Sequence, residues 1–165
     1  MKKLICSLKD KVLQVYMILA VAALVVMILA CFYQVFGRYV LNASPGWTEE
    51  LSRFTFIWMS ALGSAIALDR GAHASITLLS EHLPDIPRRT LAMILQVVIA
   101  VISVLLIIYG WQLAKATMKT PSAALKIPMG YINIALSAAG LGMLLSSINS
   151  ILTAYDKKEE KEEKA

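Results

Sequence analysis

The sequence predicts an all-α integral membrane protein with four transmembrane helices and both termini in the cytoplasm. Of its 165 residues, 58% are hydrophobic and only 16% are charged, a composition typical of a chain whose main solvent is lipid. The apolar residues form four long blocks, and the charges gather at their ends. Residues 12–155 therefore form one four-helix transmembrane domain, between a basic N-terminal segment (1–11) and a charged tail (156–165).

The N-terminal segment, MKKLICSLKDK, places four lysines among apolar residues. At helical spacing this gives a basic amphipathic segment suited to membrane lipid with anionic headgroups, and a disordered basic tail is the alternative. Residues 12–36 form the first span, which at ~1.5 Å per residue is ~37 Å long and crosses the bilayer with some tilt. A cleaved signal peptide is disfavoured because this apolar run is much longer than a signal sequence needs.

The second span is expected at residues 45–68, since Ser44 is a good N-cap and Pro45 suits the first helical position. The third span covers residues 91–113. The remaining elements are a connection at residues 71–90, expected as a short interfacial helix or an irregular loop, a short return before the fourth span, the fourth span itself at residues 127–152, and a disordered tail at residues 156–165.

The orientation follows from the distribution of lysine and arginine. With the N-terminus inside, eleven of these bases lie on the cytoplasmic side and five on the outer side, as the positive-inside rule requires. Both termini are therefore predicted to be cytoplasmic. The stretch GRYVLNASPGWTEEL, between the first two spans, faces outward.

This outward stretch and the start of the second span carry an unusual number of charged and aromatic residues. Arg53 lies near the membrane boundary, where pairing with Glu49 or Glu50 would offset the cost of its charge. The group is predicted either to brace the first two helices and dock an external protein, or to serve as helix caps within an aromatic belt. Its members are Arg38, Tyr39, Trp47, Glu49, Glu50 and Arg53.

Two rows of small residues at four-residue spacing allow helices to approach closely. The first row, on the second span, is Gly63, Ala67 and Gly71. The second row, on the fourth span, is Ala138, Gly142 and Ser146. Each row is suited either to packing inside the bundle or to contact with a partner, and the sequence leaves this choice open.

The spans carry little reactive chemistry. Every Asp and Glu lies at or beyond the end of a span, and the two cysteines are expected to be free thiols. His73 lies four residues after Asp69, which suggests a local polar contact on the cytoplasmic side rather than a metal site. We therefore predict no catalytic, cofactor or metal site and no nucleic-acid binding, because membrane topology explains the basic excess.

The segment FGRYVLNASPGWTEELSRFTFIWMSALGSAIALDRGAH resembles the small membrane subunit, the DctQ-like or Q subunit, of tripartite ATP-independent periplasmic (TRAP) transporters. The family has other residues where Ser52 and Asp69 stand here. The matching elements are Arg38-Tyr39, Trp47, Glu49-Glu50-Leu51, Arg53, Trp58, Gly63, Arg70-Gly71-Ala72-His73, Leu83-Pro84 and Leu125-Lys126-Ile127-Pro128-Met129.

The resemblance implies partners rather than an activity. In that family, a large multi-span membrane subunit carries the substrate and sodium sites and moves as an elevator, and a periplasmic binding protein delivers an organic acid. The small subunit is then a scaffold in the bacterial inner membrane that supports sodium-driven uptake without cofactor or enzymatic activity. The alternative is a self-sufficient four-helix transporter or channel that acts as a homo-oligomer.

Overall fold

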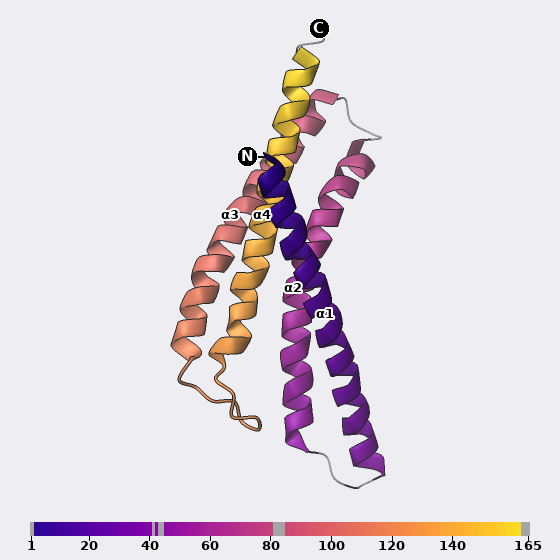
Figure 1. Cartoon of the computed structure of the whole chain (residues 1–165), viewed down its shortest axis with the longest axis vertical. Coiled ribbons are helices and arrows are strands. Elements are labelled where there is room, and N and C mark those ends of the chain that lie inside the picture. The colour runs from indigo at the N-terminus through magenta and orange to yellow at the C-terminus, as the bar shows by residue number, and fades with distance from the viewer. Residues whose placement is uncertain (1, 41, 43–44, 81–84, 163–165) are drawn as a thin grey trace.

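The computed structural model is built from four long helices (Figure 1). They are α1 (Lys2–Tyr39), α2 (Gly46–Ser80), α3 (Asp85–Thr117) and α4 (Gly130–Glu162). The structure describes the backbone of residues 2–40, 42, 45–80 and 85–162, and the side chains of residues 7–40, 42, 45–71 and 93–151.

Each helix contains a stretch long and apolar enough to cross a membrane, which confirms the predicted four-span architecture. These stretches are Ser7–Tyr39, Gly46–Gly71, Met93–Thr117 and Gly130–Ile151. At ~1.5 Å per residue, even the 22-residue stretch in α4 reaches ~33 Å, which matches the ~30 Å hydrocarbon core.

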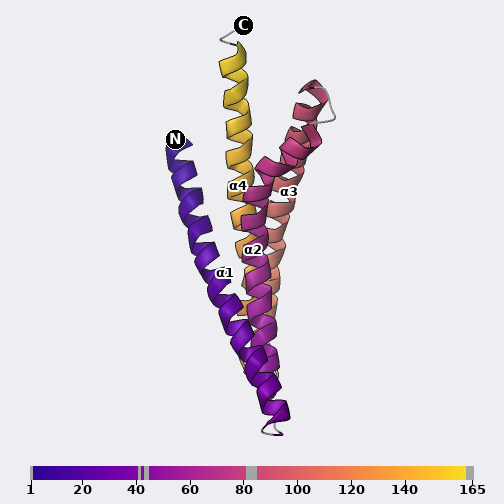
Figure 2. The same cartoon turned by 90° about the vertical axis from the view of Figure 1, so that its right-hand side faces the viewer.

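The helices form two antiparallel hairpins joined along one seam. Helix α1 packs on α2, α3 packs on α4, and the hairpins meet mainly where α2 lies against α4. In the described part of the chain α1 does not contact α3, so the helices are ordered α1, α2, α4, α3 across the molecule. Figure 2 shows α1 and α4 spreading apart toward their terminal ends. The outer helices α1 and α3 therefore expose most of their apolar surface.

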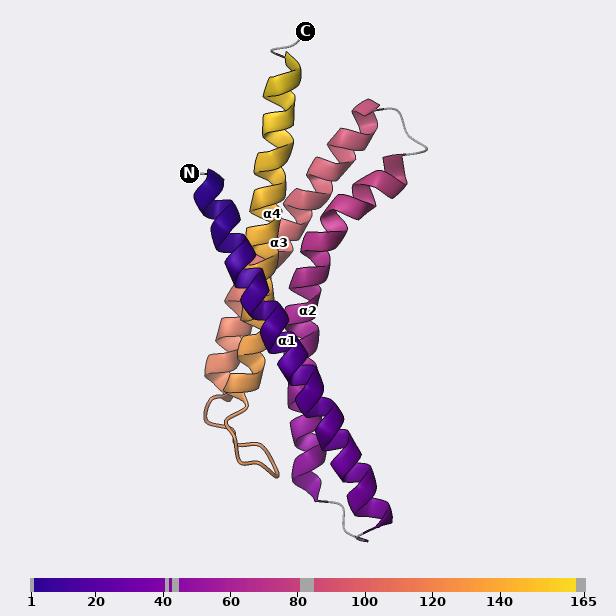
Figure 3. The same ribbon diagram turned by 45° about the vertical axis from the view of Figure 1, so that its right-hand side comes forward.

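Both chain termini lie at one end of the molecule, here called the terminus end (Figures 1 and 3). The opposite end is called the hairpin end, because there α1 turns into α2 and α3 turns into α4. These names describe the molecule without reference to the side of a membrane.

The interior is lined by small and hydroxyl-bearing side chains rather than by large apolar ones. Among the described residues, Leu62 is the largest side chain that is fully buried, and Ala65 and Ala135 are also fully buried. Ser103 and Ser147 are also buried, and each hydroxyl donates to a backbone carbonyl of α3. Lipid tails are as apolar as leucine, so the hydrophobic effect does not drive helices together within a membrane. Close packing and hydrogen bonds between helices drive their association instead.

Three helix ends differ from the sequence-based expectation. Residues 71–80 continue α2 instead of forming a separate interfacial helix, because the sequence has no proline between the start of α2 and Pro84. Helix α3 begins at Asp85, since Pro87 in its first turn costs no hydrogen bond. Helix α4 reaches Glu162 through residues composed largely of lysine and glutamate, which are good helix formers.

Candidate functional site

At the hairpin end, Glu50 joins α2 to the loop between α3 and α4. Its carboxylate accepts hydrogen bonds from the backbone N–H groups of Ala123, Ala124 and Leu125, at 3.0, 3.0 and 2.6 Å. Consecutive N–H groups that converge in this way form a nest suited to an anion. Glu50 therefore belongs to a contact between the two hairpins rather than to an ion pair with an arginine.

The loop that receives Glu50 is itself tightly closed. The N–H of Ser122 donates to the carbonyl of Ile127 at 2.9 Å, and the N–H of Met129 donates to the carbonyl of Thr120 at 3.0 Å. Lys126 completes the turn with a φ of 57°, in the left-handed region. Non-glycine residues seldom adopt this conformation, so the surrounding hydrogen bonds must hold it in place.

The contacts of Arg53, Glu49 and Trp47 stay within the hairpin of α1 and α2. Arg53 pairs with Glu49 one turn earlier, at 2.9 Å, with both side chains about two-thirds exposed, so the pair contributes only ~0.3–0.5 kcal/mol. The ring of Trp47 packs on Tyr33 of α1 with 5.7 Å between centroids.

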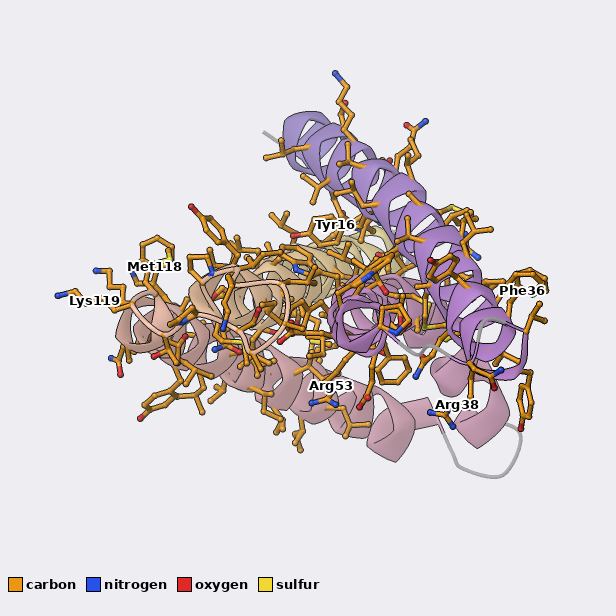
Figure 4. The ribbon with its side chains drawn as sticks, turned by 90° about the horizontal axis from the view of Figure 1, so that it is seen from below. Tyr16, Phe36, Arg38, Arg53, Met118 and Lys119 are labelled. Atoms are coloured by element: carbon orange, nitrogen blue, oxygen red, sulfur yellow. The ribbon has the colours of Figure 1, made fainter. Side chains whose placement is uncertain are left out.

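Arg38 and Tyr39, in the last turn of α1, are exposed. Among the described residues, Arg38 forms no ion pair with Glu49 or Glu50. Figure 4, which views the hairpin end, shows Arg38 and Arg53 on this face. At the hairpin end, Tyr33 and Trp47 therefore form an aromatic contact between α1 and α2 in which Arg38 takes no part.

The small-residue row of α4 lies inside the bundle. A Cβ added to Gly142 would come within 2.7 Å of the ring of Tyr16 and within 2.8 Å of Ala65. The hydroxyl of Tyr16 donates to the carbonyl of Ala138 at 2.7 Å, and this side chain lies between α1 and α4 in Figure 4. The α4 row is thus where α1, α2 and α4 converge.

The small-residue row of α2 has the opposite environment. Nothing lies within 4 Å of a Cβ built on Gly63 or on Gly71, and Ala67 is exposed. Ser60 and Ser64 are exposed on the same side of the helix. We call Ser60, Gly63, Ser64, Ala67 and Gly71 the open face of α2.

At the terminus end, a partly buried ion pair links three helices. Lys9 of α1 is 7% exposed, and its ammonium lies 3.0 Å from a carboxylate oxygen of Asp69 on α2. The same oxygen accepts a hydrogen bond from the Ser146 hydroxyl of α4 at 2.6 Å. The expected contact of Asp69 with His73 lies outside the described residues, because the side chain of His73 is not among them.

Sequence reasoning missed Lys9 and Tyr16 as packing residues. Lys9 and Asp69 are predicted to lie at the same membrane boundary, which was a usable signal for the pair. Tyr16 is a hydroxyl-bearing aromatic near the start of an apolar run, and a buried tyrosine generally needs a hydrogen-bond partner. Within the described part of the chain, no three His, Cys, Asp or Glu side chains come close enough together to hold a metal ion.

The geometry is that of a four-span membrane bundle whose polar groups tie its own helices together. The sequence model of the DctQ component of tripartite ATP-independent periplasmic transporters matches residues 27–156. The chain belongs to this family. The DctQ assignment accounts for most of the bundle, from the middle of α1 to the last turns of α4.

Curated relatives carry the same description. The chain is 29% identical over 134 residues to the sialic acid TRAP transporter small permease protein SiaQ of Vibrio cholerae, covering 81% of this chain and 78% of the relative. It is 30% identical over 131 residues to a putative TRAP transporter small permease protein of Haemophilus influenzae, covering 79% of this chain and 80% of the relative. This DctQ protein is therefore a small permease subunit of a TRAP transporter, and a multi-pass protein of the bacterial inner membrane.

Proposed function

We propose that this subunit is a scaffold for a large multi-span membrane subunit, and that the pair takes up an organic acid with sodium. In this account a periplasmic binding protein delivers the acid to the hairpin end, which faces outward. The basic residues support that orientation, since eleven lie on the terminus side and five on the hairpin side. The substrate and sodium sites belong to the large subunit.

One observation carries this proposal: α2 is only weakly apolar and yet remains uncovered. By hydropathy, α2 and α4 are the two least apolar spans. Burial explains the low hydropathy of α4, because 39% of its most apolar stretch is buried inside the bundle. The corresponding stretch of α2 is only 17% buried. Small and hydroxyl-bearing residues gain little from facing lipid tails but pack well against another helix. A second membrane protein on the open face of α2 accounts for both facts.

The proposal is tested by reconstitution. Vesicles that contain the purified subunit alone, or the subunit with its large partner, receive the binding protein, a sodium gradient and labelled carboxylates, including sialic acids and dicarboxylates. We expect uptake only when the large subunit and the gradient are both present. Uptake by the small subunit alone would show instead a self-sufficient transporter or channel and would overturn the scaffold role.

A further inference from the structure

The loop between α3 and α4 reaches sideways to the start of α2. Figures 1 and 3 both show this loop extending away from its own hairpin until it lies beside the first turns of α2. Glu50 fastens it there through three backbone N–H groups. The two hairpins meet mainly along α2 and α4, and Glu50 attaches the loop separately to the start of α2.

The loop's own hydrogen bonds leave these three N–H groups available for Glu50. Within the loop, the N–H groups of Ser122 and Met129 donate to backbone carbonyls, and that of Ile127 donates to the hydroxyl of Ser122. The N–H groups of Ala123, Ala124 and Leu125 donate to the carboxylate. Hydrogen bonds to an ionised carboxylate are stronger than those between neutral groups, so one side chain is able to hold the whole turn.

The loop between α3 and α4 exposes two positively charged side chains at the hairpin end. Lys119, at the start of the loop, and Lys126, near its end, are both exposed, and Lys119 extends from the edge of the hairpin end in Figure 4. Among the described residues at this end, the two carboxylates are already engaged, Glu49 by Arg53 and Glu50 by the loop. The lysines are therefore available to an acidic surface on another protein.

We propose that Glu50 is a positioning residue, which holds the loop so that Lys119 and Lys126 meet an acidic surface of the soluble binding protein. This inference rests on the proposed function for the orientation of the hairpin end and for the identity of the docking protein. Glu50 itself acts through the loop and does not contact the binding protein.

The first measurement tests whether Glu50 holds the loop against the start of α2. In a variant with Cys6 and Cys31 replaced by serine, spin labels are placed at the exposed positions Phe56 and Ala124, and their distance distribution is measured by pulsed electron paramagnetic resonance. We expect one narrow distribution for Glu50, a broad one for Glu50→Ala, and an intermediate one for Glu50→Gln, which keeps one acceptor oxygen. A narrow distance distribution in Glu50→Ala would show that Glu50 does not hold the loop in place.

The second measurement tests positioning, using the assembled small and large subunits in vesicles. Uptake is measured against the concentration of the binding protein. In Glu50→Ala we expect the half-saturating concentration to rise roughly tenfold with an unchanged maximal rate, and partial recovery in Glu50→Gln. The control Lys11→Gln removes one exposed charge at the terminus end, away from the loop, and leaves the curve unchanged.

The outcomes separate the two proposals. A broadened distance distribution with an unchanged half-saturating concentration overturns the positioning role. Uptake by the unaltered complex that does not depend on the binding protein contradicts the proposed function instead, whatever the spin labels show.

Discussion

At the scale of single residues, Gly142 and Gly63 belong to rows that look alike in the sequence but have opposite surroundings. Gly142 faces Tyr16 and Ala65 at distances that leave no room for a methyl group, whereas Gly63 faces open space. The spacing of small residues predicts a close-packing surface, and the choice between interior and exterior depends on how the helices are arranged. That choice required the structure.

Gly142→Ala is expected to destabilise the bundle by about 1–3 kcal/mol, because its new methyl group overlaps the tyrosine ring and Ala65. Gly63→Ala is the matched control and should leave stability unchanged or slightly improved. Thermal unfolding of each variant in detergent micelles measures the difference. Equal stability of the two variants would contradict the assignment of the α4 row to the interior.

Asp69 on α2 ties three helices together, because it contacts both Lys9 of α1 and Ser146 of α4. Asp69→Asn leaves Lys9 with only its 3.4 Å contact to Asp10, whose side chain is 63% exposed, so we expect a loss of about 1–3 kcal/mol. Replacing both residues, as Lys9→Met with Asp69→Asn, should recover most of that loss because no isolated charge remains. Chemical unfolding in micelles, with the exposed Lys11→Met as control, measures these effects. A double variant no more stable than Asp69→Asn would refute the pairing.

At the scale of elements, the apolar blocks predicted the four spans because each is as long as the bilayer is thick. The helix extensions beyond the spans were harder to predict. Past the membrane boundary hydrophobic periodicity no longer applies, and only stop signals such as Pro84 mark a helix end.

The loop between α3 and α4 shows why part of the candidate site was out of reach of sequence reasoning. The partner of Glu50 is a set of backbone N–H groups, and backbone groups have no sequence signature. The charge pattern offered Arg53 either Glu49 or Glu50 as a partner, and the structure pairs it with Glu49. The prediction that these residues form an ionic group at this end is refined into two separate contacts.

The conformation of Lys126 gives a test of the loop. Lys126→Gly should fold with nearly unchanged stability. Glycine adopts a φ of 57° without strain, and this gain offsets the greater conformational entropy of glycine in the unfolded chain. Lys126→Val should lose about 1–3 kcal/mol, since a β-branched residue is strongly disfavoured in that region. Unfolding temperatures of the two variants decide the matter. A valine variant as stable as the glycine variant would contradict the turn.

At the scale of the whole molecule, the arrangement suits an immobile support. Polar contacts tie the helices together at both ends, through Glu50 at one and Asp69 at the other. These two acids lie 19 residues apart on α2, or ~28 Å along the helix, close to the thickness of the hydrocarbon core. The polar contacts therefore fall at the two membrane boundaries, and the open face of α2, apart from Gly71, lies between them.

The central claim is that this open face contacts the large permease subunit. A photo-crosslinking amino acid is placed at Gly63 on the open face or at Ile102, an exposed position of α3, and the two subunits are co-expressed in bacterial membranes. After irradiation, we predict a covalent adduct with the large subunit, identified by mass spectrometry, from position 63 and none from position 102. An adduct from position 102 alone would contradict the account.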